Sequence, residues 1–106
     1  MKMTMLELII REYIAIVGAL EKGYEVENNR TIIDRENFKR MLETNAFATF
    51  TQKTKAYKDL NFIIHDNESY TMPYKDKESK KTVRKVIINY KTYLTVKKLY
   101  NSIANI

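Results

Sequence analysis

The residues best suited to chemistry are the positive side chains between Tyr74 and Lys85. This twelve-residue stretch holds six positive and two negative residues, and β-leaning runs at 69–74 and 82–90 flank it. The pattern predicts a β-hairpin with a basic tip. Such a tip binds the phosphate backbone of DNA or enters a narrow minor groove. The candidate DNA-binding residues of the hairpin are Lys75, Lys77, Lys80, Lys81, Arg84 and Lys85.

A simpler interpretation of the same stretch is a lysine-rich loop that protects an edge strand against aggregation. Six positive residues in twelve are more than that protection requires. We therefore favour contact with DNA at this hairpin.

A second group of candidates lies on a helix predicted over 49–60. Thr49 and Gln52 have the spacing of a capping box, which satisfies two backbone N–H groups at the start of a helix. The polar face is predicted to point to solvent or to a ligand, with the amide pairing with an adenine edge and the ammonium groups meeting phosphate or guanine. An ordinary solvated helix face explains these residues about equally well. The candidate DNA-binding residues of this helix are Gln52, Lys53, Lys55 and Lys58.

Catalysis and metal binding have little support in the sequence. His65 is the only histidine and there is no cysteine, so no His–His or Cys–His pair can form. Asp66 and Glu68 lie near it, but one histidine and two carboxylates in a turn are a weak metal pattern. The glycine motifs of phosphate-binding loops, dinucleotide-binding folds and nucleophile elbows are absent from the sequence. We expect a protein that is not an enzyme, with no catalytic residues, no metal and no cofactor.

The net charge of +6 is unevenly placed along the chain. Residues 1–48 carry seven positive and eight negative residues, whereas residues 49–106 carry twelve positive and five negative ones. A one-sided basic field favours a polyanion such as nucleic acid as the partner. With no cysteine, no signal-peptide pattern and no apolar run of about 20 residues, the sequence predicts a cytoplasmic protein that does not bind a membrane.

Hydrophobic periodicity predicts the helices and strands that carry these candidate residues. The expected elements are a helix over 4–22, a short strand at 30–33, a helix over 34–44 with Asp34 as N-cap, a helix over 49–60, strands at 61–65, 69–74 and 82–90, and a helix over 92–104 capped by Thr92. The short link at 45–48 is what a helix-turn-helix requires. The order predicts an α+β fold, a winged helix-turn-helix with an additional C-terminal helix. It forms one domain over 1–106, with the helix-turn-helix at about 34–60, the β-wing at about 62–90 and the C-terminal helix at about 92–104.

The run D-R-E-N-F-K-R-M-L-E-T-N-A-F-A-T-F-T-Q-K-T-K-A-Y-K-D-L-N-F-I, followed by the basic hairpin, resembles the winged helix proteins of Firmicutes plasmids and mobile elements. With its length and its C-terminal helix, the chain is similar to the TcpK group of clostridial conjugative plasmids. The likeness is one of architecture, length and composition, and covers 34–90 well and the terminal helices loosely. It implies a dimer that binds repeats within an origin of transfer, with the wing as a principal contact. The implied contacts are the six positive residues of the hairpin with Gln52, Lys53 and Lys55.

We therefore expect a sequence-specific double-stranded DNA-binding protein that acts at a plasmid origin of transfer in conjugation. A homodimer is expected because one small domain reads few base pairs, and because the first and last helices carry more apolar residues than one platform needs. Other conjugation or replication proteins are further expected partners. The alternatives are a transcription or replication regulator of a mobile element and a protein-binding module with a basic face. Binding to single strands is the weakest alternative, since only Tyr74 offers a ring close to the wing.

Overall fold

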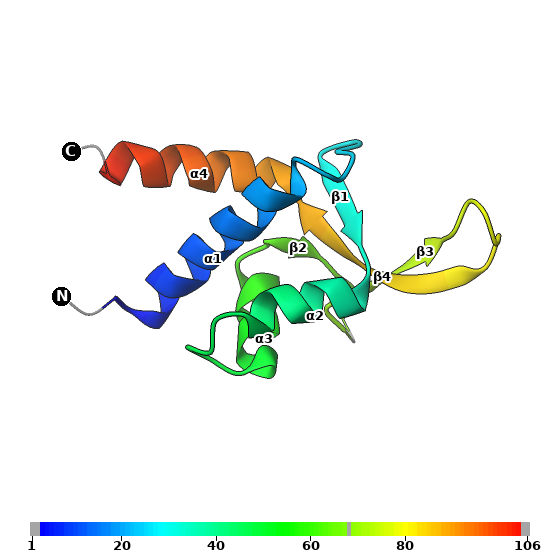
Figure 1. Cartoon of the computed structure of the whole chain (residues 1–106), viewed down its shortest axis with the longest axis horizontal. Coiled ribbons are helices and arrows are strands. Elements are labelled where there is room, and N and C mark those ends of the chain that lie inside the picture. The colour runs from blue at the N-terminus through cyan, green and yellow to red at the C-terminus, as the bar shows by residue number, and fades with distance from the viewer. Residues whose placement is uncertain (1–2, 68, 105–106) are drawn as a thin grey trace.

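The computed structural model, which describes residues 3–67 and 69–104, has an α+β architecture of four helices and a four-stranded antiparallel sheet (Figure 1). The elements are α1 (Met5–Leu20), β1 (Arg30–Ile33), α2 (Arg35–Glu43), α3 (Phe50–Asp59), β2 (Ile63–Ile64), β3 (Met72–Lys75), β4 (Thr82–Asn89) and α4 (Tyr90–Ala104). The predicted class and the predicted order of helices and strands are confirmed. Within the described ranges, no helix is long and apolar enough to cross a membrane.

Strand β4 organises the sheet because it pairs with the other three strands. Its second half lies between β1 and β2, so that Ile88 is opposite Thr31 on one side and Ile63 on the other. Its first half pairs only with β3, with Tyr74 opposite Val83. The β3–β4 hairpin therefore extends beyond the body of the molecule, at the end opposite the free ends of α1 and α4 (Figure 1).

The core lies between the inner face of β4 and the helices. Val86 and Ile88 alternate along the strand and are fully buried, together with side chains from α1, α2 and α3. Tyr13 of α1 occupies the centre, with its ring stacked on Phe62 at a centroid distance of 3.8 Å and edge-on to Tyr57 of α3 at 5.9 Å. Aromatic pairs of this kind add to the burial energy. The core therefore fixes α3 and the hairpin relative to each other.

The predicted caps of two helices have different outcomes. Asp34 is the N-cap residue of α2, as predicted, but its side chain makes no capping hydrogen bond, because its carboxylate pairs with Lys85. Thr92 does not cap α4, which begins at Tyr90, directly after β4. Asn89 takes that role, its Oδ1 accepting a hydrogen bond from the Thr92 backbone N–H at 3.1 Å.

The last turn of α1 is tied to the first turn of α4 by Glu21. Its carboxylate accepts hydrogen bonds from the hydroxyls of Tyr90 at 2.5 Å and Tyr93 at 2.7 Å. These bonds lower the pKa of Glu21. The bond to Glu21 raises the pKa of Tyr90 to about 12, while burial, followed by the same carboxylate, raises the pKa of Tyr93 to about 12. The two helices are thus joined where they meet the sheet.

Candidate nucleic-acid interface

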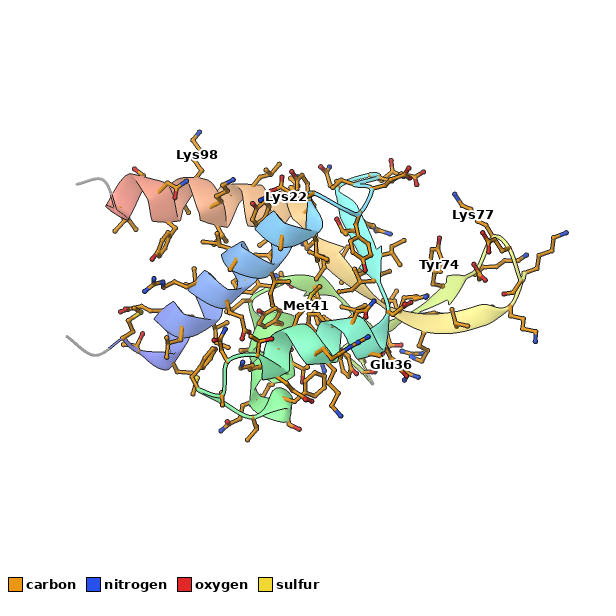
Figure 2. The ribbon with its side chains drawn as sticks, in the orientation of Figure 1. Lys22, Glu36, Met41, Tyr74, Lys77 and Lys98 are labelled. Carbon is orange, nitrogen blue, oxygen red and sulfur yellow. The ribbon has the colours of Figure 1, made fainter. Side chains whose placement is uncertain are left out.

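The tip of the β3–β4 hairpin is a hydrogen-bonded turn built on Asp76. The Asp76 carboxylate accepts hydrogen bonds from the backbone N–H of Ser79 at 3.2 Å and from its hydroxyl at 2.7 Å, and these lower the pKa of Asp76. The Asp76 N–H donates to the Lys81 carbonyl at 2.9 Å, and the Lys80 N–H donates to the Asp76 carbonyl at 2.9 Å. This turn presents a group of solvent-exposed lysines, as Figure 2 shows for Lys77. The exposed lysines of the tip are Lys75, Lys77, Lys80 and Lys81.

Lys80 has a backbone conformation that lysine rarely adopts. Its φ is 59°, in the left-handed region, and the other non-glycine residues with positive φ among those described are Asn28, Asn29 and Asn61. Asparagine tolerates this region because its short side chain bonds locally, whereas other L-residues lose roughly 1–2 kcal/mol there. The chain therefore holds a charged side chain at a position where asparagine or glycine would be more stable.

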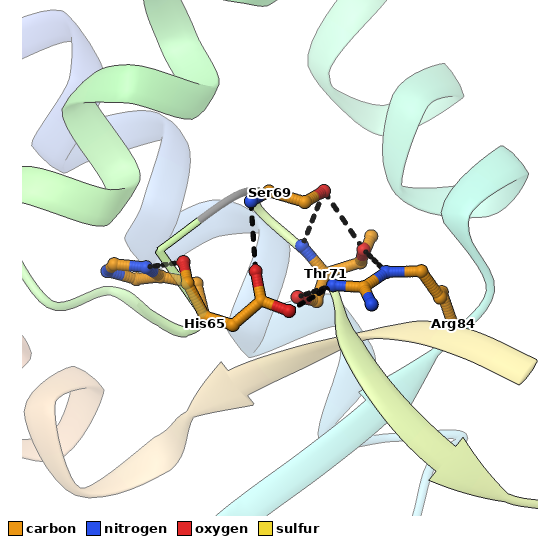
Figure 3. Close-up of polar contacts among 5 residues, drawn as sticks. His65, Ser69, Thr71 and Arg84 are labelled. Carbon is orange, nitrogen blue, oxygen red and sulfur yellow. Dashed lines mark hydrogen bonds and ion pairs between the residues drawn. The ribbon is translucent and has the colours of Figure 1, made fainter.

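Arg84, at the base of the hairpin, binds within the protein instead of facing outward (Figure 3). Its Nε donates to the Thr71 hydroxyl at 2.8 Å, one Nη donates to the Thr71 carbonyl at 3.0 Å, and the same Nη pairs with Asp66. Asp66 also accepts a hydrogen bond from the Ser69 N–H at 2.9 Å. Arg84 thus ties β4 to Asp66 and Thr71 ahead of β3, and its contact with DNA stays a prediction.

Lys85 is the second hairpin cation held by a carboxylate of the same chain. Its Nζ pairs with Asp34 at the start of α2, and its side chain is 26 % exposed. Together with Arg84, it joins the base of the hairpin to the body of the molecule. Of the positive charge on the hairpin, the part outside these two ion pairs therefore lies at the tip.

Gln52 on α3 is exposed, but its side-chain oxygen is engaged. Gln52 Oε1 accepts a hydrogen bond from the Thr49 N–H at 2.9 Å, and Thr49 Oγ1 accepts one from the Gln52 N–H at 3.1 Å. The predicted capping box is confirmed. A bidentate contact with adenine uses both the oxygen and the nitrogen of the amide. In this state Gln52 has only its NH₂ group to offer to a base or a phosphate.

Lys53 was predicted to face solvent, and that prediction is wrong. The residue is 1 % exposed. Its Nζ donates to Glu12 Oε2 at 2.6 Å and to the carbonyls of Leu42 and Asn45 at 2.5 Å each. These acceptors match the three donors of an ammonium group. Lys53 thereby joins α1, the end of α2 and the turn before α3, and has no exposed atoms for DNA.

Two aromatic side chains also contact the buried Lys53–Glu12 ion pair. Lys53 Nζ lies 4.1 Å from the centroid of the Phe47 ring, so Phe47 packs beside Lys53. Glu12 also accepts a hydrogen bond from the Tyr57 hydroxyl at 2.8 Å, and burial raises the pKa of Tyr57. The position of Glu12 indicates a buried ion pair, and the sequence analysis missed this signal. Glu12 lies among the apolar positions of the first helix, and a buried carboxylate requires a cation.

Lys55 and Lys58 border an open hollow of about 600 Å³ between α3 and the loop before β3. Tyr70 forms the opposite side of this hollow, with its ring held by Phe50 at a centroid distance of 5.4 Å and by Phe38 at 6.1 Å. Hydroxyl groups in the lining that the sequence did not single out belong to Thr51, Thr54 and Ser69. Hydroxyl and ammonium groups along one groove match the chemistry of a sugar–phosphate backbone.

The predicted site residues therefore fall into three groups. The tip lysines are exposed together at one end of the molecule, Gln52, Lys55 and Lys58 lie on the outer side of α3, and Lys53, Arg84 and Lys85 serve the structure itself. The sequence matches no protein-family model and no curated protein.

Proposed function

We propose that the chain is a winged helix-turn-helix domain with an additional C-terminal helix, and that it binds double-stranded DNA without catalysing a reaction. The observation that carries this proposal is the ordered basic tip of the β3–β4 hairpin, which presents four exposed lysines beyond the body of the molecule. The order of helix, strand, two helices joined by a short turn, and then a hairpin supports the winged helix assignment.

In this proposal the wing supplies most of the affinity. Its lysines neutralise phosphates and release counterions, which favours binding and makes it sensitive to salt. The hydrogen bonds of Asp76 hold the turn before DNA arrives, so less conformational entropy is lost on binding. The left-handed conformation of Lys80 supports the same interpretation, because a charge is kept there despite a backbone cost.

Helix α3 contributes the sequence preference in this proposal. Its exposed Thr51 and Gln52 lie in the N-terminal half, the part of a recognition helix that contacts base edges, and Lys55 follows about one turn later. Lys58 and Tyr70 border the hollow beside the helix. In this proposal they contact the sugar–phosphate backbone of the DNA next to the bases that α3 contacts. The buried Lys53–Glu12 pair holds α3 against α1, so the helix meets the groove as a rigid element.

The resemblance to the TcpK group supplies the biological setting of the proposal. We place the protein at a plasmid origin of transfer in conjugation, in the cytoplasm and as a homodimer. Control of transcription or replication on a mobile element uses the same DNA-binding chemistry. Selection of binding sites from a random pool of duplexes distinguishes these settings through the sequences recovered.

A charge-matched comparison tests the role of the wing. Lys77→Ala/Lys81→Ala removes two tip charges, whereas Lys22→Ala/Lys91→Ala removes two exposed charges from the ends of α1 and α4. Fluorescence anisotropy with a random duplex, measured over a range of salt concentrations, gives the affinity and its salt dependence. At about 0.9 per phosphate contact, the wing variant should lower the magnitude of the log–log salt slope by about 1.8, and the control should leave it unchanged. Equal effects of the two variants would show that net charge alone attracts DNA and would contradict the proposed wing contact.

A further inference from the structure

The proposed wing, the β3–β4 hairpin, is held at its base from both faces. There the first half of β4 pairs only with β3, so the sheet alone does not determine the direction in which the hairpin extends. Neighbouring residues of a strand point to opposite faces. Arg84 pairs with Asp66 on one face, and Lys85 pairs with Asp34 on the other. The direction of the wing is therefore set by side chains at its base.

The residues that hold Arg84 belong to a segment that also packs on α3. The Thr71 hydroxyl and carbonyl accept hydrogen bonds from Arg84 at 2.8 Å and 3.0 Å, and the Thr71 hydroxyl lies 3.0 Å from the hydroxyl of Ser69 (Figure 3). Tyr70, between these two residues, packs its ring edge-on against Phe50 of α3. The same segment thus contacts both the wing and α3. Its bridging residues are Asp66, Ser69, Tyr70 and Thr71.

We propose that Arg84 is a positioning residue for DNA binding and that it acts through the bridging residues. It holds the wing so that the tip lysines and the hollow beside α3 contact one duplex at the same time. The guanidinium suits this role, because its donors have a fixed planar geometry and bind a hydroxyl, a carbonyl and a carboxylate together. Thr71 is 1 % exposed, so two of these acceptors are fixed inside the protein. The inference rests on the proposed function, because it concerns how two proposed DNA-binding surfaces act together.

Two surfaces that contact the same duplex both contribute to the salt dependence of binding. The wing contributes its exposed tip lysines, and the hollow contributes Lys55 and Lys58. Once the tip has bound, contact at the hollow is intramolecular, and it forms only where the geometry allows both contacts at once. A wing without a fixed direction therefore loses the two contacts of the hollow, or about 1.8 of the salt slope at about 0.9 per phosphate. This loss occurs without the removal of any positive charge.

Asp66→Asn tests this role in fluorescence anisotropy titrations of a random duplex over a range of salt concentrations. The variant weakens the hold on Arg84 and removes a negative charge, so charge alone predicts tighter binding. The positioning role predicts weaker binding instead, with a log–log salt slope lower in magnitude by about 1.8. The matched control is Asp59→Asn, which removes an exposed carboxylate at the end of α3 and should leave the slope unchanged.

Two further variants make the test independent of the charge at Asp66. Arg84→Lys retains the positive charge but lacks the planar fork, and Thr71→Val removes a hydroxyl without changing any charge. Each should lower the slope in the same direction as Asp66→Asn, with a circular dichroism spectrum like that of the wild type. Asp66→Asn/Arg84→Lys should lose no more than Arg84→Lys alone, since both substitutions act on one contact.

A direct contact between Arg84 and DNA gives the opposite pattern. Asp66→Asn would then free the guanidinium and tighten binding, and Arg84→Lys would keep the slope, and either result would overturn the positioning role. Folded variants with lower melting temperatures but an unchanged slope would also overturn it, because the network would then serve stability alone. Absence of duplex binding by the wild type would contradict the proposed function itself, whereas wild-type binding with unmoved slopes in the variants overturns only this inference.

Discussion

Replacing Lys53 with methionine is expected to cost far more stability than any other single lysine substitution on α3. The change removes a cation that is 1 % exposed and leaves Glu12 buried, with the Tyr57 hydroxyl as its remaining partner. It also leaves the carbonyls of Leu42 and Asn45 without this donor. Methionine nearly matches the lysine stem in volume, so the loss is electrostatic rather than a packing cavity.

The magnitude follows from the burial of both partners. Their side chains are 1 % and 2 % exposed, so solvent screens the pair very little. Removing one member of a buried ion pair destabilises a protein by about 3–5 kcal/mol. That is a large part of the total stability of a domain, about 5–15 kcal/mol. With a urea slope of about 2 kcal/mol/M, the unfolding midpoint should fall by about 2 M.

Urea denaturation followed by circular dichroism measures this loss, with Lys55→Met as the matched control. Lys55 lies two residues away on the same helix and is exposed, so its substitution should change stability by less than about 0.5 kcal/mol. The double variant Glu12→Gln/Lys53→Met removes the buried charge and should recover part of the lost stability. Equal midpoints for Lys53→Met and Lys55→Met would refute the assignment of Lys53 to the interior.

Two further predictions concern the wing and the buried tyrosines. Lys80→Asn should keep or slightly raise the melting temperature, because asparagine suits a φ of 59°, while weakening duplex binding through the lost charge; a lower melting temperature would contradict the assigned conformation. The second prediction is that the protein unfolds at alkaline pH. The pKa of Tyr93 is raised from 10.0 to about 12, chiefly by burial and then by its hydrogen bond to Glu21. The folded state therefore retains the phenolic proton more strongly than the unfolded chain. This stability is present below pH 10.0 and is lost as the pH rises toward about 12. Circular dichroism and tyrosinate absorbance should therefore change together in that range, and free ionisation of all tyrosines in a folded protein would contradict the buried hydroxyls.

Much of the fold was predictable because local signals agree with tertiary packing. The Thr49–Gln52 capping box, the apolar stripes of the helices and the β-branched run of β4 each determine a local structure that the core also requires. The N-cap position of Asp34 was predicted correctly, but the partner of its carboxylate was not, because that partner is 51 positions away. The cap of α4 was placed at Thr92 instead of Asn89 because β4 continues directly into the helix.

The candidate site was harder to predict because the charge of a side chain does not report its partner. Three of the predicted DNA contacts, Lys53, Arg84 and Lys85, pair with carboxylates contributed by α1, by the loop before β3 and by the start of α2. Helical spacing places Lys53 on the apolar face of α3, three residues after Phe50 and four before Tyr57, but its charge favoured the opposite prediction. Burial of its ammonium group is favourable because Glu12 and two carbonyls surround it. The tip lysines were predicted as exposed, since a tight turn outside the sheet leaves long side chains in solvent.

The most direct measurement of the central claim is the affinity of the wild-type protein for a random duplex as a function of salt. Four tip lysines at about 0.9 per contact predict that log K falls with log salt with a slope of at least about 3.6 in magnitude, and that duplex is preferred to single strands. Absence of binding to the duplex at low salt, in a protein whose circular dichroism spectrum shows the intact fold, would contradict the proposal that this chain binds DNA.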